Sequence, residues 1–108
     1  MIVTICGSMR FFGQMLQIAA DETAKGNIVL VPFSVVAPEH QGSQFKAMLD
    51  RLHVEKIDMA EQIVVVTNQH GYIGNSTRRE MGYALATGKS IDVREFHLPE
   101  PTPSRWTS

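Results

Sequence analysis

Short, uninterrupted apolar runs constrain the fold of this chain more than any other feature of its sequence. They lie at residues 2–6, 28–31 and 63–67, and the third, Ile-Val-Val-Val-Thr, is rich in β-branched residues. Runs of this length and composition are typical of strands that are buried on both faces of a parallel sheet. Pro32 ends the second run, and Gly7 ends the first. We therefore predict three buried strands at these positions.

The stretches between these runs are amphipathic. Apolar residues recur there at helical spacing, which predicts helices over about 10–25, from shortly after 43 to about 60, and over about 76–87. Residues 90–96 are expected to form a fourth strand. Alternating strands and helices favour an α/β fold, here a three-layer, flavodoxin- or Rossmann-like open parallel sheet of about four strands with helices on both faces.

Length and composition indicate one globular domain. The chain has 108 residues, with 10 basic and 11 acidic side chains and a formal net charge of -1. We expect the domain to span residues 1–96, and residues 97–108, which contain three prolines, to form a flexible tail. The balanced charge, without a Lys/Arg block, argues against binding to duplex nucleic acid.

Other function classes are disfavoured by what the sequence lacks. No apolar run approaches the roughly 18 residues of a membrane span, and no signal-type stretch follows the N-terminus. The single cysteine cannot form an internal disulfide, and no Cys/His spacing is typical of a zinc site. We therefore expect a cytoplasmic protein without a metal or another cofactor.

In open parallel sheets, ligands bind beyond the carboxyl ends of the strands, near the point where the strand order reverses. The first segment at this edge contains Gly7, Ser8 and Arg10. Glycine lets the backbone approach a ligand, the hydroxyl can bind an anion beside helix amides, and the guanidinium can contact a phosphate or carboxylate. A tight turn in which Ser8 caps the next helix explains the segment equally well.

The segment after the third strand is glycine-rich and leads into a helix. Gly74, Asn75 and Ser76 could form a cradle for an anion, and Glu80 follows in the predicted first turn. The spacing Thr77-x-x-Glu80 also matches a capping box, in which the glutamate only bonds to the helix terminus. From spacing alone, the capping box is the favoured interpretation.

The long second helix carries two further candidates, Asp50 and His53. Their i, i+3 spacing places both on one side of the helix, where they either face the ligand-binding edge or flank the apolar stripe. Because the helix runs antiparallel to the next strand, Asp58 and Glu61 are expected at the opposite edge of the sheet.

Three segments together resemble the nucleoside 2-deoxyribosyltransferase-like superfamily, and in particular its short bacterial and phage members, which are related to deoxynucleoside 5'-monophosphate N-glycosidases. These segments are Cys-Gly-Ser-Met-Arg at 6–10, Leu-His-x-x-Lys-Ile-Asp-Met-Ala at 52–60, and Gly-Tyr-Ile-Gly-x-Ser-Thr-Arg-Arg-Glu-Met-x-Tyr-Ala at 71–84. The resemblance covers residues 1–96. It implies cleavage or transfer at the N-glycosidic bond of a nucleoside or its 5'-monophosphate.

The resemblance also implies roles for individual residues. Glu80 matches the family's nucleophilic glutamate, which reverses the preference for a capping role. Gly7, Ser8 and Arg10 match a loop that contacts the sugar or 5'-phosphate, and Ser76 matches a small polar residue near the phosphate. His53 stands where the family has an aspartate.

Further expectations follow from the same resemblance. His53 or Asp50 would protonate the departing base, and Tyr72 would either stack on that base or serve as a packing anchor. A homodimer or a larger homo-oligomer is expected. Two alternatives stay open: a nucleotide-binding module without turnover, and a glycohydrolase that acts on another N-riboside.

Overall fold

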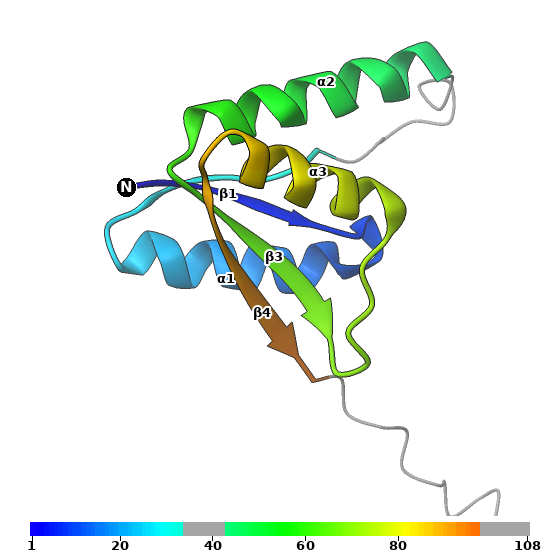
Figure 1. Ribbon diagram of the computed structural model, residues 1–108. Coiled ribbons are helices and arrows are strands. Elements are labelled where there is room, and N and C mark those ends of the chain that lie inside the picture. The colour runs from blue at the N-terminus through cyan, green and yellow to red at the C-terminus, as the bar shows by residue number, and fades with distance from the viewer. Residues whose placement is uncertain (34–42, 98–108) are drawn as a thin grey trace, which may run out of the picture.

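The computed structural model describes residues 1–33 and 43–97. The chain alternates between strands and helices, as predicted (Figure 1). In chain order the elements are β1 (Ile2–Gly7), the 3-10 helix η1 (Met9–Phe11), α1 (Phe12–Ala24), β2 (Ile28–Leu30), α2 (Ser43–Met59), β3 (Gln62–Asn68), α3 (Asn75–Ala86) and β4 (Ser90–Phe96).

The four strands form one parallel sheet in the order β2-β1-β3-β4. Val3 pairs with Gln62 across the two central strands, and Gln62 pairs with Ser90 at the start of β4. The chain adds β2 on one side of β1 and then β3 and β4 on the other, so the strand order reverses between β1 and β3. This confirms the predicted α/β fold and places the expected ligand-binding edge at the carboxyl ends of these two strands.

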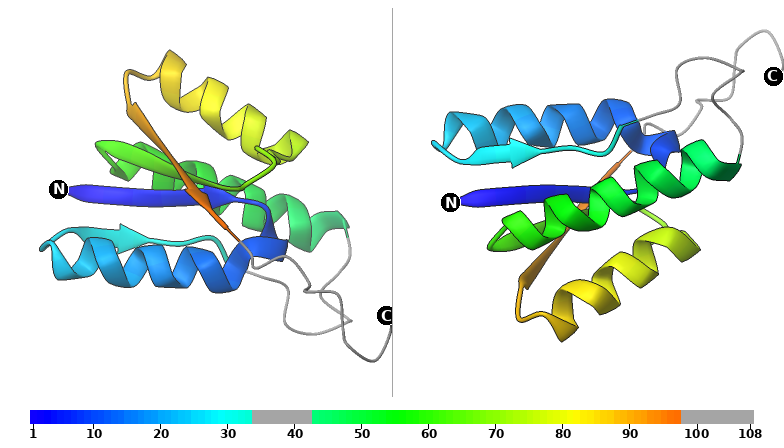
Figure 2. Two further views of the ribbon diagram at one scale, coloured as in Figure 1. Left: turned by 90° about the horizontal axis from the view of Figure 1, so that it is seen from below. Right: turned by 90° about the horizontal axis from the view of Figure 1, so that it is seen from above.

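The sheet is covered on both faces, and alternate residues of β1 and β3 pack against different helices (Figure 2). One cluster joins α1 and η1 to the sheet through Val3, Ile5, Phe11, Met15, Val64 and Val66. The other joins α2 and α3 to the opposite face through Cys6, Ile57, Ile63, Val65 and Ala84. The two-residue period of a strand therefore points Cys6 toward α2 and α3.

The element boundaries differ only slightly from the predicted ones. The first helix begins as the short 3-10 turn η1 before α1, and α3 begins at Asn75. Gly26 and Gly88 follow α1 and α3 with φ of 88° and 79°, a left-handed conformation that favours glycine and ends both helices. The expected tail lies outside the described residues except for His97, so the predicted domain boundary stays a prediction.

Two acidic residues lie at the amino edge of the sheet, as predicted. The Asp58 carboxylate accepts a hydrogen bond from the Tyr83 hydroxyl, and the Asp58 carbonyl accepts one from Lys89 at 2.9 Å. The Glu61 amide donates to the carbonyl of Ile2, at the start of β1, at 3.0 Å. Among the described residues, no helix is both long and apolar enough to cross a membrane.

Candidate active site

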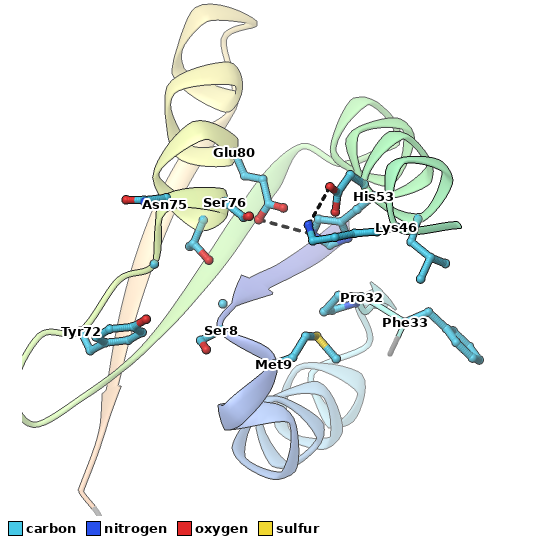
Figure 3. Close-up of a pocket in the computed structure, with 15 residues that line it drawn as sticks. Ser8, Met9, Pro32, Phe33, Lys46, His53, Tyr72, Asn75, Ser76 and Glu80 are labelled. Atoms are coloured by element: carbon cyan, nitrogen blue, oxygen red, sulfur yellow. Dashed lines mark hydrogen bonds and ion pairs between the residues drawn. The ribbon is translucent and has the colours of Figure 1, made fainter. Parts of the chain in front are cut away.

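A cavity of about 360 Å³ opens at the carboxyl ends of β1 and β3 (Figure 3). Its volume falls within the range of small-molecule sites in proteins. The lining comes from four regions: the turn after β1, the end of β2, one face of α2, and the loop that leads into α3. The residues are Gly7, Ser8, Met9, Pro32, Phe33, Lys46, Leu49, Asp50, His53, Tyr72, Gly74, Asn75, Ser76, Thr77 and Glu80.

Little space surrounds Gly7, the last residue of β1. A Cβ atom on Gly7 would lie 3.3 Å from both the Met15 sulfur and the Val66 carbonyl oxygen. Ser8 is the N-cap of η1, and its hydroxyl accepts a hydrogen bond from the Arg10 amide at 3.4 Å. The capping interpretation of Ser8 is therefore confirmed, while the side chain also lines the cavity.

Arg10 does not line the cavity, although the sequence predicts a contact with a ligand. Its guanidinium carbon lies 4.4 Å from the centre of the Tyr72 ring, in a cation–π contact. Tyr72 itself lines the cavity and meets Phe11 edge-on at 6.0 Å between ring centres. Arg10 thus supports the ring from outside the cavity, and a direct contact with a ligand stays a prediction.

The start of α3 shows that the capping-box interpretation of Glu80 is wrong. The N-cap is Gly74, so Thr77 lies in the first turn, where it is buried, and Glu80 is the sixth helical residue. A side chain one turn beyond the box position does not bond to the N-cap amide. Gly74, Asn75 and Ser76 line the cavity at the amino end of α3, where free amides and the helix dipole favour negative charge.

One face of α2 contributes three polar side chains to the cavity. Lys46, Asp50 and His53 follow one another at helical spacing, and all three line the cavity. Asp50 and His53 are the two candidates that the sequence indicates on this helix. The Lys46 ammonium lies 3.0 Å from the Asp50 carboxylate, and both side chains are more than half exposed. His53 lies deeper and is only 6% exposed.

Glu80 and His53 meet below the cavity floor, together with Cys6. The His53 Nε2 atom lies 3.8 Å from Glu80 Oε1 and 3.4 Å from Cys6 Sγ. Figure 3 shows His53 on α2 and Glu80 on α3 pointing toward each other. Cys6 is fully buried, whereas 18% of the Glu80 side chain is exposed. The glutamate is therefore the member of this cluster that a bound molecule reaches most readily.

Comparison with solved structures relates the fold of this chain to that of a known protein. A 2-deoxyribosyltransferase from Leishmania mexicana superimposes with a TM-score of 0.66 at 19% sequence identity, over 87% of this chain and 63% of that chain. The chain has a nucleoside 2-deoxyribosyltransferase-like fold. It spans less than two thirds of the length of that transferase. No family model and no curated protein matches the sequence.

Burial shifts the pKa values of the three clustered groups. Desolvation raises the pKa of Glu80 to about 7, although a hydrogen bond from Cys6 opposes the shift. Desolvation also raises the pKa of the Cys6 thiol, and the nearby Glu80 raises it further. At neutral pH the cysteine is therefore a thiol, and the glutamate retains a proton more readily than an ordinary carboxyl group.

The same environment makes His53 neutral. Desolvation and the charge of Lys56 lower its pKa to about 4, against the opposing effect of Asp50. A neutral imidazole is a poor acid, so the structure does not favour the predicted role of His53 in protonating a departing base. The other candidate, Asp50, lines the cavity from the same helix.

Cys6, Lys46 and Thr77 are site residues that sequence reasoning misses. Cys6 belongs to an apolar strand and gives no polar signal, although the period of that strand places it on the same face as Thr4, whose hydroxyl donates to the Lys56 carbonyl of α2. Lys46 precedes Asp50 by one helical turn, a spacing that could have identified it.

Proposed function

We propose that this protein cleaves or transfers the N-glycosidic bond of a nucleoside, a deoxynucleoside or the 5'-monophosphate of either, with Glu80 as the nucleophile. The carboxylate of Glu80 supports this proposal most directly. It is largely buried, lies at the base of a cavity of about 360 Å³, and belongs to a 2-deoxyribosyltransferase-like fold. Such a group suits attack on a sugar carbon from which bulk water is excluded.

The reaction would proceed in two displacements. A Glu80 oxygen attacks the anomeric carbon through an oxocarbenium-like state, the bond from that carbon to the base nitrogen breaks, and the base leaves with the bonding electrons. Water or a second base then attacks the same carbon, and the carboxylate is released. Water gives hydrolysis, whereas a second base gives transfer.

Protonation of the departing base makes it a better leaving group. We assign this role to Asp50, the other polar candidate on this face of α2, which lines the cavity and would act as an acid once its ion pair with Lys46 opens. The neutral His53 is instead a positioning residue, since its Nε2 lies 3.4 Å from the Cys6 sulfur and 3.8 Å from a Glu80 carboxylate oxygen.

The remaining lining residues suit the other parts of a nucleoside. Asn75 and Ser76, at the amino end of α3, line the cavity together with Ser8. We expect these three residues to bind sugar hydroxyls or a 5'-phosphate. Tyr72 offers a ring for stacking against the base. Homo-oligomer formation and a cytoplasmic location remain part of the proposal.

Release of free base is the direct test. Untagged protein is incubated with each nucleoside, each deoxynucleoside and the corresponding 5'-monophosphates, and free base is measured by chromatography, with and without a second base as acceptor. We expect release from at least one substrate and a loss on the order of 10³-fold or more in Glu80→Gln, as for other removed nucleophiles. Glu55→Gln is the matched control, because Glu55 is an exposed residue of α2.

The alternative of a nucleotide-binding module gives a different result. Binding without turnover predicts no base from any substrate, and a nucleotide that raises the melting temperature equally in the wild type and in Glu80→Gln. Release of an unusual base from another N-riboside, lost in Glu80→Gln, would retain the nucleophile and change the substrate.

A further inference from the structure

The cluster of Cys6, His53 and Glu80 combines three kinds of metal-binding atom. A thiol sulfur, an imidazole nitrogen and a carboxylate oxygen lie within 4.8 Å of one another, and they come from β1, α2 and α3. Thiolate and imidazole are ligands that Zn²⁺ and chemically similar ions prefer, whereas Mg²⁺ and Ca²⁺ prefer sites made of oxygen atoms. The chemistry of the set therefore points to a borderline-soft divalent cation.

Two of the three distances between the ligand atoms lie near those of a tetrahedral site. With Zn–S near 2.3 Å and Zn–N near 2.0–2.1 Å, tetrahedral angles place sulfur and nitrogen about 3.6 Å apart, and nitrogen and oxygen about 3.4 Å apart. The corresponding separations here are 3.4 Å from Cys6 Sγ to His53 Nε2 and 3.8 Å from His53 Nε2 to Glu80 Oε1. The third pair, Cys6 Sγ and the Glu80 oxygen, lies within 4.8 Å, so side-chain adjustments would bring all three atoms to bonding distance from one ion.

The fourth position would be open. His53 and Glu80 both line the cavity, while Cys6 closes the cluster from the sheet side. Three protein ligands that leave a fourth position for water or substrate are typical of catalytic zinc sites, whereas structural sites use four protein ligands. We propose that Cys6, His53 and Glu80 bind one Zn²⁺ ion whose fourth coordination position faces the cavity.

Binding would use the sulfur as a thiolate. The ion displaces the thiol proton to solvent, the sulfur electron pair forms the S–Zn bond, and no oxidation takes place. With the metal on Nε2, the imidazole proton resides on Nδ1, a buried atom without a hydrogen-bond partner among the described residues. Because metal-bound histidines usually donate that proton to a partner, we expect a dissociation constant on the order of micromolar, weaker than that of structural zinc sites.

Occupation of the site would block the proposed reaction. A Glu80 oxygen bonded to Zn²⁺ cannot attack the anomeric carbon, so zinc would act as a reversible inhibitor. This consequence rests on the proposed function, whereas metal binding itself does not.

Co²⁺ provides a spectroscopic test that needs no substrate. Untagged protein is first stripped with a chelator and then titrated with Co²⁺, which replaces Zn²⁺ and gives a thiolate charge-transfer band together with the intense visible bands of a tetrahedral site. Competition between the protein and a chromophoric chelator gives the stoichiometry and affinity for Zn²⁺. We expect one equivalent to bind, with loss of the charge-transfer band in Cys6→Ser and at least 100-fold weaker zinc binding in Cys6→Ser and His53→Gln.

His97→Gln is the control for adventitious surface binding, since His97 is exposed and pairs with Glu95. Binding that survives in Cys6→Ser but is lost in His97→Gln would overturn the proposal, as would binding weaker than millimolar in the wild type. Glu80→Gln keeps the thiol and the imidazole, so it should weaken metal binding without removing the charge-transfer band. This variant also tests the site if Cys6→Ser and His53→Gln do not fold. A cobalt site without base release would refute the proposed function alone, whereas base release that is insensitive to Zn²⁺, without a cobalt site, would refute the metal site alone.

Discussion

Replacement of Glu80 by glutamine should stabilise the protein, and the gain should depend on pH. Burial raises the pKa of Glu80 from 4.5 to about 7, so ionisation of this carboxyl opposes folding. Between these two pH values the native state retains a proton that the unfolded state has lost. The stability of the wild type therefore falls as the pH rises from about 4.5 to about 7, and this effect is constant above that range.

The size of the effect follows from the two pKa values. At 1.36 kcal/mol per pKa unit, the carboxyl destabilises the native state by less than 1 kcal/mol at pH 5 and by about 3 kcal/mol at pH 8. Glutamine has nearly the same shape and does not ionise. The stability difference between Glu80→Gln and the wild type should thus be larger by about 2.5 kcal/mol at pH 8 than at pH 5, or roughly 10–20 °C in melting temperature.

Chemical denaturation at both pH values measures this difference directly. Comparison between two pH values cancels any change in packing that the glutamine introduces, because that change is present at both. With a pKa of about 4, His53 is largely neutral in the folded protein at both pH values, so it adds little to the difference. Glu55→Gln should show no such pH dependence. An equal effect of Glu80→Gln at pH 5 and pH 8 would refute the reasoning, because it would mean that the carboxylate is solvated in the folded protein.

Three further predictions follow from the same geometry. The kcat/KM for base release should rise as the pH increases toward about 7, because attack requires ionised Glu80; a profile that is flat between about pH 5.5 and 7 would contradict this. Gly7→Ala should destabilise the protein by about 1–3 kcal/mol in urea unfolding, because the new Cβ would lie 3.3 Å from two neighbouring atoms. Gly82→Ala is the control and should stabilise the protein by about 1 kcal/mol. Gly82 lies within a helix, and a Cβ there would have no described atom within 4 Å. Tyr72→Ala should raise KM by roughly tenfold with little change in kcat, because stacking on a base is worth about 1–3 kcal/mol; an unchanged KM would place the base elsewhere.

The sheet was predictable because its signal is local. The apolar runs of β1 and β3 exclude most alternatives to buried parallel strands, and the rule for open sheets then identifies the edge at which the cavity lies. The spacing of Asp50 and His53 also predicts that they share one side of α2, but only the packing of the helix shows that this side lines the cavity.

The cluster beneath the cavity could not be predicted in the same way. Positions 6, 53 and 80 come from three elements, and their proximity depends on how α2 and α3 pack on the sheet. The pattern Thr77-x-x-Glu80 was misleading because it does not show where a helix begins. With Gly74 as the N-cap, the glutamate lies one turn beyond the capping position and is directed into the site.

The proposed reaction uses Cys6 as a thiol, whereas the proposed metal site uses it as a thiolate. One substitution at Cys6 can therefore test the two proposals separately. As a thiol, Cys6 donates a hydrogen bond to the Glu80 carboxylate and lowers its pKa, which favours the nucleophile. As a thiolate bound to Zn²⁺, it would help to hold the ion that removes that nucleophile. Serine retains a hydrogen-bond donor but is a poor zinc ligand, so Cys6→Ser should abolish inhibition by Zn²⁺. For each protein, the rate of base release without Zn²⁺ is divided by the rate with Zn²⁺, which removes the effect of the variant on the basal rate. The same ratio in Cys6→Ser and in the wild type would show that zinc acts elsewhere.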